Sequence, residues 1–275
     1  MTTGAASVRR QALHNELMAA GKPWTRDDLL VAMHLYCQMP FGQFHSRNPT
    51  IIAIASRMGR TPSSLSMKLC NLASLDTSHQ ERGVVGLKRA GQGDRDIWAS
   101  FLADWEGMAA ASATALEHLG LVAGSEPVPG PEPVTPTGPT ETTATVRVRR
   151  GQDFFRATVL TAYGRQCCLT GCDVEDFLVA SHILPWAKDA GQRLNPRNGL
   201  CLAALQDRAF DRGFIGLDDD LKVIISRELR LHEGNLAVKA QLLALEEASI
   251  RVPERFAPDR ELIRKHREQV FAARN

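Results

Sequence analysis

One histidine and a pair of closely spaced aspartates fall within about thirty residues of one another in the stretch ASHILPWAKDAGQRLNPRNGLCLAALQDRAFDRG, residues 180–213. Asp207 and Asp211 are four residues apart, which places both carboxylates on one face of a helix. Hard oxygen ligands of this kind bind Mg²⁺ or Mn²⁺, and a neutral histidine such as His182 can accept a proton near pH 7. A general base beside a divalent cation is the combination that phosphodiester hydrolysis requires.

Two amides complete this set of residues. Gln206 lies on the adjacent helix face, and its side-chain oxygen can coordinate a hard cation, although more weakly than a carboxylate or an imidazole. Residue 206 could therefore also face the cation site. Asn198 lies in the turn before the helix, where an asparagine can hydrogen-bond the backbone and so fix the position of His182.

A strand, a turn and a helix must position these side chains. The segment 176–183 (DFLVASHI) alternates with period two and predicts a strand that ends near His182. The sequence NPRNG at 195–199 is a turn signal, and the apolar run GLCL predicts the returning strand. Residues 204–212 predict a helix with Gly213 as its C′ residue, and FIGLDDDLKVIIS predicts a hairpin after it.

The chain divides at a proline-rich segment. Residues 124–145 hold six of the fourteen prolines, three glutamates and no basic residue, which predicts a flexible tether. We therefore expect an α+β protein with an all-α domain over 1–123, the linker, and a second domain over 146–275. No apolar run is long enough to cross a membrane, and the first residues lack the apolar core of a secretory signal, so we expect a cytoplasmic protein.

The first domain contains a candidate helix-turn-helix. Asn48-Pro49 and Thr61-Pro62 each begin a short helix, and Gly59 ends the first of them. The second helix would present polar side chains outward, among them Lys68 and Asn71, which can reach DNA phosphates or base edges. The alternative is a helical bundle with a polar outer face.

Basic residues cluster in two places of the second domain. Arg147, Arg149, Arg150 and Arg156 surround the start of a helix that Gly164 ends, where they could bind a backbone phosphate or form a solvated face. Arg208 and Arg212 lie on the acidic helix, where they could contact DNA or pair with Asp207 and Asp211. The net charge of +2 alone does not indicate a nucleic-acid partner.

The six cysteines favour reduced, buried thiols in a chain without an export signal. Cys167 or Cys168 with Cys172 could form half of a zinc site, with Cys201 as a third thiolate. The sequence offers no obvious fourth ligand, so we favour small buried side chains.

Several spaced motifs in the second domain resemble those of the HNH endonuclease family, in its bacterial branch with a Ser/Ala-His-Ile-x-Pro-Trp strand. The motifs here are Ser181-His182-Ile183-Leu184-Pro185-Trp186, Asn198-Gly199 and Phe210-Asp211-Arg212-Gly213. The similarity extends over about residues 149–271. Segments of the first domain resemble helices found ahead of such nuclease domains, a much weaker match.

The resemblance implies a ββα-metal fold, a double-stranded DNA substrate and a divalent cation, Mg²⁺ or Mn²⁺, with Zn²⁺ or Ni²⁺ also compatible. It implies that His182 is the general base, that Asn198 is the middle asparagine of the motif, and that a residue of the helix binds the metal. Relatives often carry Leu-His-Asp where this chain has Leu205-Gln206-Asp207, whereas nine residues on from Asn198, the more common spacing, lies Asp207. Ser181 stands where relatives carry an acid.

Two functions remain open on this basis. The first is a metal-dependent endonuclease that restricts foreign or modified DNA, with activity weakened by Gln206 and with a homodimer as one way to cut both strands. The second is an inactive HNH-fold protein that holds DNA without cutting it. Both require His182 and an oxygen from residues 206–207 to converge where a phosphate can lie.

Overall fold

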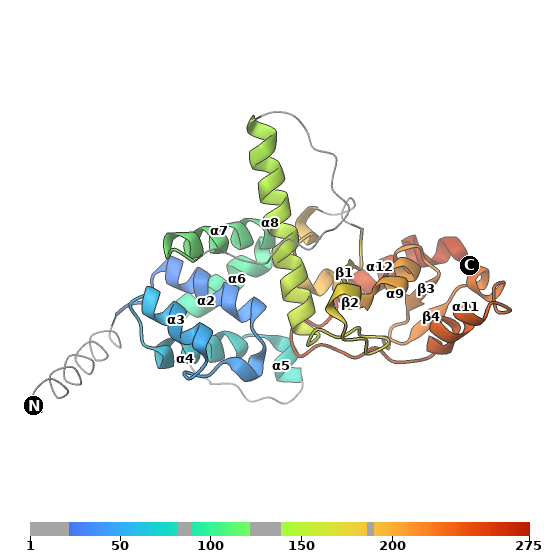
Figure 1. The fold of residues 1–275 in the computed structure, drawn as a ribbon, viewed down its shortest axis with the longest axis horizontal. Coiled ribbons are helices and arrows are strands. Elements are labelled where there is room, and N and C mark those ends of the chain that lie inside the picture. The colour runs from blue at the N-terminus through green and yellow to red at the C-terminus, as the bar shows by residue number, and fades with distance from the viewer. Residues whose placement is uncertain (1–21, 82–89, 122–138, 186–189) are drawn as a thin grey trace, which may run out of the picture. The chain divides into compact units, whose positions relative to one another are not determined.

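The computed structural model describes residues 22–81, 90–121, 139–185 and 190–275, and these fall into two compact units (Figure 1). Met1–Ala103 and Met108–Val128 form one unit, and Asp104–Gly107 and Pro129–Asn275 form the other. Residues 124–138 of the predicted linker lie outside the described part of the chain, and its last residues begin a helix. The domain limits 1–123, 124–145 and 146–275 stay predictions.

The first unit is helical throughout its described residues, as expected from the sequence. A short 3₁₀ helix, η1 (Phe41–Gln43), joins the first two of its helices. The α-helices are α2 (Arg26–Gln38), α3 (Pro49–Arg57), α4 (Pro62–Ala73), α5 (Thr77–Glu81), α6 (Gln92–Ala103) and α7 (Trp105–His118).

Polar side chains cap the helices of this unit at the positions that the sequence predicts. Thr25 and Asp28 form a capping box at α2, in which Thr25 Oγ1 accepts from the Asp28 amide at 3.2 Å. Asn48 caps α3, and Thr61 caps α4, each by accepting a backbone hydrogen bond. These bonds satisfy amides that a helix leaves without a partner in its first turn.

Helices α3 and α4 pack together across Gly59, which has a left-handed φ of +61°. Leu65, Leu69 and Leu72 of α4 are fully buried, as their helical spacing predicts. The two-helix unit is therefore present, while its contact with DNA stays a prediction.

The expectation that Lys68 faces outward is wrong. Its ammonium lies 2.5 Å from a carboxylate oxygen of Asp94, and 4.6 Å from the ring centroid of Trp24. Asp94 is 1% exposed, and a buried carboxylate needs a charged or hydrogen-bonding partner. Lys68 therefore stabilises the interior of the unit, whereas Asn71 is half-buried on the same helix.

The second unit contains two small antiparallel sheets among helices. The 3₁₀ helices η2 (Glu175–Phe177) and η4 (Pro196–Asn198) precede β1 and β2. The main elements are α8 (Pro139–Ala162), β1 (Leu178–His182), β2 (Gly199–Ala203), α9 (Ala204–Asp211), β3 (Ile215–Leu217), β4 (Val223–Ile225), α10 (Arg227–Arg230), α11 (Leu236–Gln241) and α12 (Arg260–Gln269).

The predicted order of strand, strand and helix is confirmed. β1 pairs with β2 in the register Leu178↔Ala203 to His182↔Gly199, and α9 follows β2 directly. The predicted hairpin after the helix is β3–β4. Gly213 has φ +74° just beyond the end of α9, and an added Cβ there would lie 2.5 Å from the Val270 carbonyl oxygen.

Helix α12 holds α9 in place through one buried histidine. The His266 ring lies flat on the Phe210 ring, with 3.8 Å between centroids, and its Nε2 donates to the Phe210 carbonyl at 3.1 Å. The structural role expected for His266 agrees with these contacts.

Among the described helices, none is both long enough and apolar enough to cross a membrane.

A buried histidine makes the stability of the first unit depend on pH. His34 of α2 is 7% exposed, and its Nδ1 lies 3.0 Å from Ser112 Oγ. Because the Ser112 hydroxyl already donates to the Ala109 carbonyl, Nδ1 is the donor to Ser112. Burial lowers the pKa of His34 to about 4, against an opposing hydrogen bond with Gln38.

We predict that acidification from pH 7 to 4 lowers the free energy of unfolding by about 3 kcal/mol through His34 alone. The unfolded chain takes up this proton near pH 6.5 and the folded chain only near pH 4, so stability present above pH 6.5 is lost as the pH falls. Denaturant melts across this range should show a shallower pH dependence for His34→Asn than for wild type. The exposed-residue control His232→Gln should match wild type. Equal slopes for His34→Asn and wild type would contradict the assignment.

Candidate active site

The last two residues of β1 face two different helices. Ser181 lies close enough to hydrogen-bond the Asp207 carboxylate of α9, and the His182 ring stacks on Phe155 of α8. Because consecutive strand residues point to opposite faces of a sheet, α8 and α9 cover opposite faces of the β1–β2 hairpin. Both helices contact both strands.

His182 is held by a ring and a carbonyl. Its ring centroid lies 4.1 Å from that of Phe155 at an interplanar angle of 9°, and its Nε2 lies 2.8 Å from the Arg193 carbonyl oxygen. A carbonyl only accepts, so Nε2 carries the proton and Nδ1 is the unprotonated nitrogen. Burial lowers the pKa of His182, an effect that the Arg193 carbonyl partly opposes, so the imidazole is neutral at pH 7.

Asn198 closes the loop that follows His182. Its Oδ1 accepts from the Leu184 amide at 2.8 Å, and its Nδ2 donates to the Leu184 carbonyl at 3.4 Å and to the Gln192 carbonyl at 3.1 Å. The residue is 1% exposed. These are the side-chain-to-backbone bonds that the sequence predicts, and they fix both ends of the loop carrying Arg193.

Gly199, which pairs with His182 across the hairpin, has no room for a side chain. An added Cβ on Gly199 would lie 2.5 Å from Val159 Cγ2 and 3.0 Å from Phe155 Cζ. The absence of a side chain lets α8 approach the hairpin closely, which brings Phe155 against the imidazole.

Two carboxylates share one face of α9. The pKa of Asp207 is raised, mainly by burial and also by the negative charge of Asp211. A hydrogen bond from the Ser181 hydroxyl and the positive charge of Arg208 act in the opposite direction. Asp211 is exposed. Asp207 and Asp211 therefore concentrate negative charge on one face of α9, which favours the binding of a cation.

Residues 167–218, which include β1, β2, α9 and β3, match the family model described as HNH endonuclease. We call residues 167–218 the HNH segment. The match confirms the resemblance for these residues, a shorter span than the 149–271 that the motifs indicate.

The chain is also similar, over part of its length, to a solved structure. One similar solved structure is titled "Modification dependent TagI restriction endonuclease", with 26% identity, coverage of 42% of this chain and 37% of that chain, and a TM-score of 0.32. The chain thus spans little more than a third of that protein, and a TM-score this low does not establish a shared overall fold. No curated protein matches the chain.

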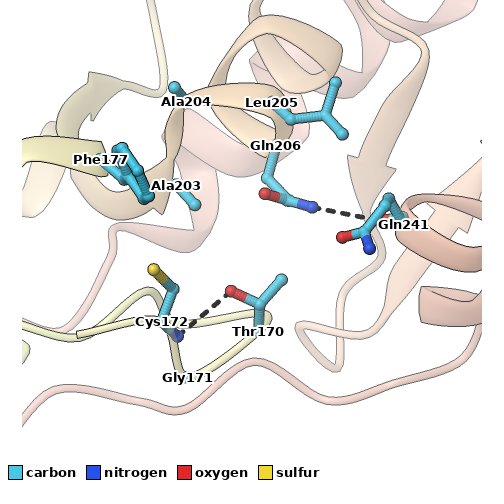
Figure 2. Close-up of a pocket in the computed structure, with 9 residues that line it drawn as sticks. All are labelled: Thr170, Gly171, Cys172, Phe177, Ala203, Ala204, Leu205, Gln206 and Gln241. Carbon is cyan, nitrogen blue, oxygen red and sulfur yellow. Dashed lines mark hydrogen bonds between the residues drawn. The ribbon is translucent and has the colours of Figure 1, made fainter. Parts of the chain in front are cut away.

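Gln206 of the HNH segment does not join the carboxylates. Its Nε2 donates to the Gln241 carbonyl at 3.0 Å, and the side chain is 2% exposed beside a cavity (Figure 2). Gln206 and Asp207 are neighbours on the helix and so point about 100° apart. The structure therefore assigns the carboxylate face to Asp207 and Asp211, and leaves Gln206 out of it.

The described contacts link Asp207 to Ser181 and not to His182. Ser181 and His182 are neighbours at the end of β1. The expected convergence of the His182 imidazole with an oxygen of α9 therefore depends on this strand end, and it stays a prediction. The sequence marks Ser181 only as a missing acid. Its contact with Asp207 follows from the alternation of β1, which puts residue 181 on the α9 side.

The arginines singled out from the sequence have different surroundings. Arg156 donates to the Leu178 carbonyl at 2.8 Å and so supports the start of β1, and its contact with a phosphate stays a prediction. Arg150, Arg208 and Arg212 are exposed. Arg147 and Arg149 lie in α8, where the structure does not describe their side chains.

The cysteines of the HNH region are free thiols, of which Cys167, Cys168 and Cys201 are buried. Burial raises the pKa of Cys168 well above its usual range and that of Cys201 to about 12. Within the described residues, no group of three or more histidine, cysteine, aspartate or glutamate side chains is placed to hold a metal ion.

We predict that Asn198→Ala destabilises the HNH unit by about 2 kcal/mol or more, because the buried Leu184 amide and two carbonyls lose their partner. Thermal melts followed by near-ultraviolet circular dichroism measure the loss. The control is Asn195→Ala in the same turn, which removes a bond to the Arg197 amide but none to Leu184. Equal melting temperatures for Asn198→Ala and wild type would contradict this role.

Proposed function

We propose that this chain is a metal-dependent DNA endonuclease, with the HNH segment as its catalytic part. The nuclease role is supported by the family match, which covers both strands and the helix of the site. The single observation that carries the proposal is the arrangement at the end of β1, where Ser181 lies beside the Asp207 carboxylate of α9 and the neighbouring His182 holds its Nε2 2.8 Å from the Arg193 carbonyl oxygen.

His182 acts in this proposal as the general base. Nε2 donates to the Arg193 carbonyl, which leaves Nδ1 to take a proton from the attacking water. The flat contact with Phe155 prevents the ring from turning, and the Asn198 bonds keep the Arg193 loop in place. Phe155 and Asn198 therefore fix the position of the His182 imidazole before the DNA substrate binds.

The donor set of α9 fits a divalent cation. Mg²⁺ and Mn²⁺ take hard oxygen ligands, and Mg²⁺ in nucleic-acid enzymes is often held by one or two carboxylates together with phosphate oxygens and water. Asp207 and Asp211 would hold it, and the bound cation would offset charge on the scissile phosphate and the leaving oxygen. We prefer Asp207 to Gln206 as the helix ligand because Gln206 points about 100° away from Asp207 around α9 and donates its Nε2 to the Gln241 carbonyl.

The target is proposed to be double-stranded DNA, and the role restriction of foreign or modified DNA, as the family resemblance implies. Arg150, Arg208 and Arg212, which are all exposed, are proposed to contact phosphates. The homodimer and the use of α3 and α4 in target choice belong to the same proposal. Phage plating on cells that express wild type or Asp207→Asn would test the defence role.

We predict that wild type nicks supercoiled plasmid in Mg²⁺ or Mn²⁺, and that His182→Ala and Asp207→Asn each lower the rate by about 100-fold or more. Gel quantification of nicked product gives the rates. The matched controls are His232→Ala and Asp220→Asn, both exposed and away from β1 and α9. Undiminished nicking by His182→Ala would contradict the proposal.

The alternative, an inactive DNA-binding HNH fold, makes a distinct prediction for the same assay. It is motivated by Ser181 in place of an acid and by Gln206, and it expects salt-sensitive DNA binding without nicking in any metal. Gln206→His distinguishes two origins of inactivity. If residue 206 were the missing ligand this substitution would restore nicking, whereas its position beside Gln241 predicts no gain.

We predict an acid limb in the pH–rate profile with a midpoint below pH 6.5, because burial lowers the pKa of the general base His182. The rate of nicking should rise as the pH increases through this midpoint and the imidazole becomes neutral. Phe155→Ala admits water to the ring and should move the midpoint towards 6.5, while Phe155→Leu, which keeps the contact apolar, should move it less. An unchanged midpoint in both Phe155 variants would show that His182 does not determine the pH–rate profile.

A further inference from the structure

A cavity of about 460 Å³ opens beside the first turn of α9 in the second unit (Figure 2). Its volume is in the range of small-ligand pockets, about 300–1,000 Å³. The lining comes from the turn after Cys168, from η2, from the β2–α9 junction and from the end of α11. The side chains that matter below are Thr170, Phe177, Leu205, Gln206 and Gln241.

The lining combines apolar and polar side chains and is uncharged. Among the described residues, those that line the cavity include no lysine, arginine, aspartate or glutamate. A phosphate would have no cation to pair with, so the cavity suits a neutral ligand with hydrogen-bonding groups. Thr170 supplies a hydroxyl, and Gln206 and Gln241 supply amides.

Gln206 presents a buried acceptor to this space. Its Nε2 is satisfied by the Gln241 carbonyl, whereas its Oε1 accepts no hydrogen bond from any described residue. Figure 2 shows the amide reaching from α9 into the cavity with its nitrogen towards Gln241. The Gln206 side chain is 2% exposed, and its Oε1 is open to the cavity, where it can accept a hydrogen bond from an N–H donor of a ligand.

The rim of the cavity offers a flat apolar surface. Phe177 is 59% exposed and Leu205 is 48% exposed. An exposed aromatic ring is a platform on which a nucleic-acid base stacks. Ala203, the N-cap of α9, has no side chain to accept from the first-turn amides, so backbone donors adjoin the same space.

The cavity adjoins the residues assigned to the reaction. Gln206 precedes Asp207 on α9, and the two side chains point about 100° apart around the helix. A DNA strand whose phosphate lies at Asp207 therefore has a nucleotide within reach of the cavity.

From these features we propose that the cavity binds one nucleobase of the DNA substrate, unpaired and turned out of the duplex, with Gln206 as a residue that determines which base is accepted. This inference rests on the proposed endonuclease function and names a subsite of it. A base enclosed by a pocket must leave the stack, which is easiest where it is already unpaired. The ring stacks on Phe177, and an amino or imino N–H of the base donates to Gln206 Oε1.

The test measures binding in EDTA, so that it does not depend on cleavage. The probes are two end-labelled duplexes of one sequence, the first with a single unpaired 2-aminopurine and the second with that base paired to thymine. Fluorescence anisotropy should give wild type an affinity for the unpaired probe about tenfold higher than for the paired one.

Phe177→Ala and Gln206→Leu should each reduce this preference to about twofold or less. Gln206→Leu keeps the side-chain volume, and Phe177 is exposed, so melting temperatures near that of wild type are expected and are measured alongside. The matched control is Val174→Ala, an equally exposed apolar residue outside the lining, which should keep the full preference.

Two outcomes would overturn the inference and can be told apart. Equal binding of both duplexes by wild type, or a preference that survives in Phe177→Ala and Gln206→Leu, removes the base subsite but leaves the endonuclease intact. No binding of either duplex at low salt would remove the DNA-directed function together with it.

Discussion

The buried amide of Asn198 is the interaction on which the geometry of the site depends. Three hydrogen bonds from this one side chain hold Leu184 and Gln192, the two sides of the loop after β1. That loop carries the Arg193 carbonyl, which selects the tautomer of His182. Since a buried amide is expensive to leave unsatisfied, its bonds define one loop conformation strongly. The chemistry proposed for the imidazole thus follows from an interaction that never touches the substrate.

The sequence predicts the local structure of this chain well, because local signals carry it. The capping box at Thr25, the prolines after Asn48 and Thr61, and Gly213 beyond α9 each determine the end of a helix through backbone chemistry within a few residues. The alternation of apolar residues before His182 similarly predicts β1. The order of strand, strand and helix needs no long-range information.

The sequence does not predict contacts that depend on tertiary packing. Lys68 has the spacing of an exposed residue, yet Asp94, 26 positions away, draws it into the interior. Gln206 and Asp207 look like alternative ligands in the sequence, and only the Gln241 carbonyl separates their roles. Arg193 and Gln241 contribute backbone carbonyls, which every residue has, so no residue type could have marked them. Phe155 reaches His182 because Gly199 leaves space between α8 and the hairpin.

The ring of His266 has a consequence for how the site is assembled during synthesis. The His266 ring packs against Phe210 of α9 and so supports this helix, although His266 follows Phe210 by 56 positions in the chain. A nascent polypeptide that has already exposed β1, β2 and α9 still lacks this support. Until α12 is synthesised, α9 is held by its contacts with β1, β2 and Gln241, and a ribosome-bound fragment ending before α12 would carry all of the proposed catalytic side chains without the added support of His266.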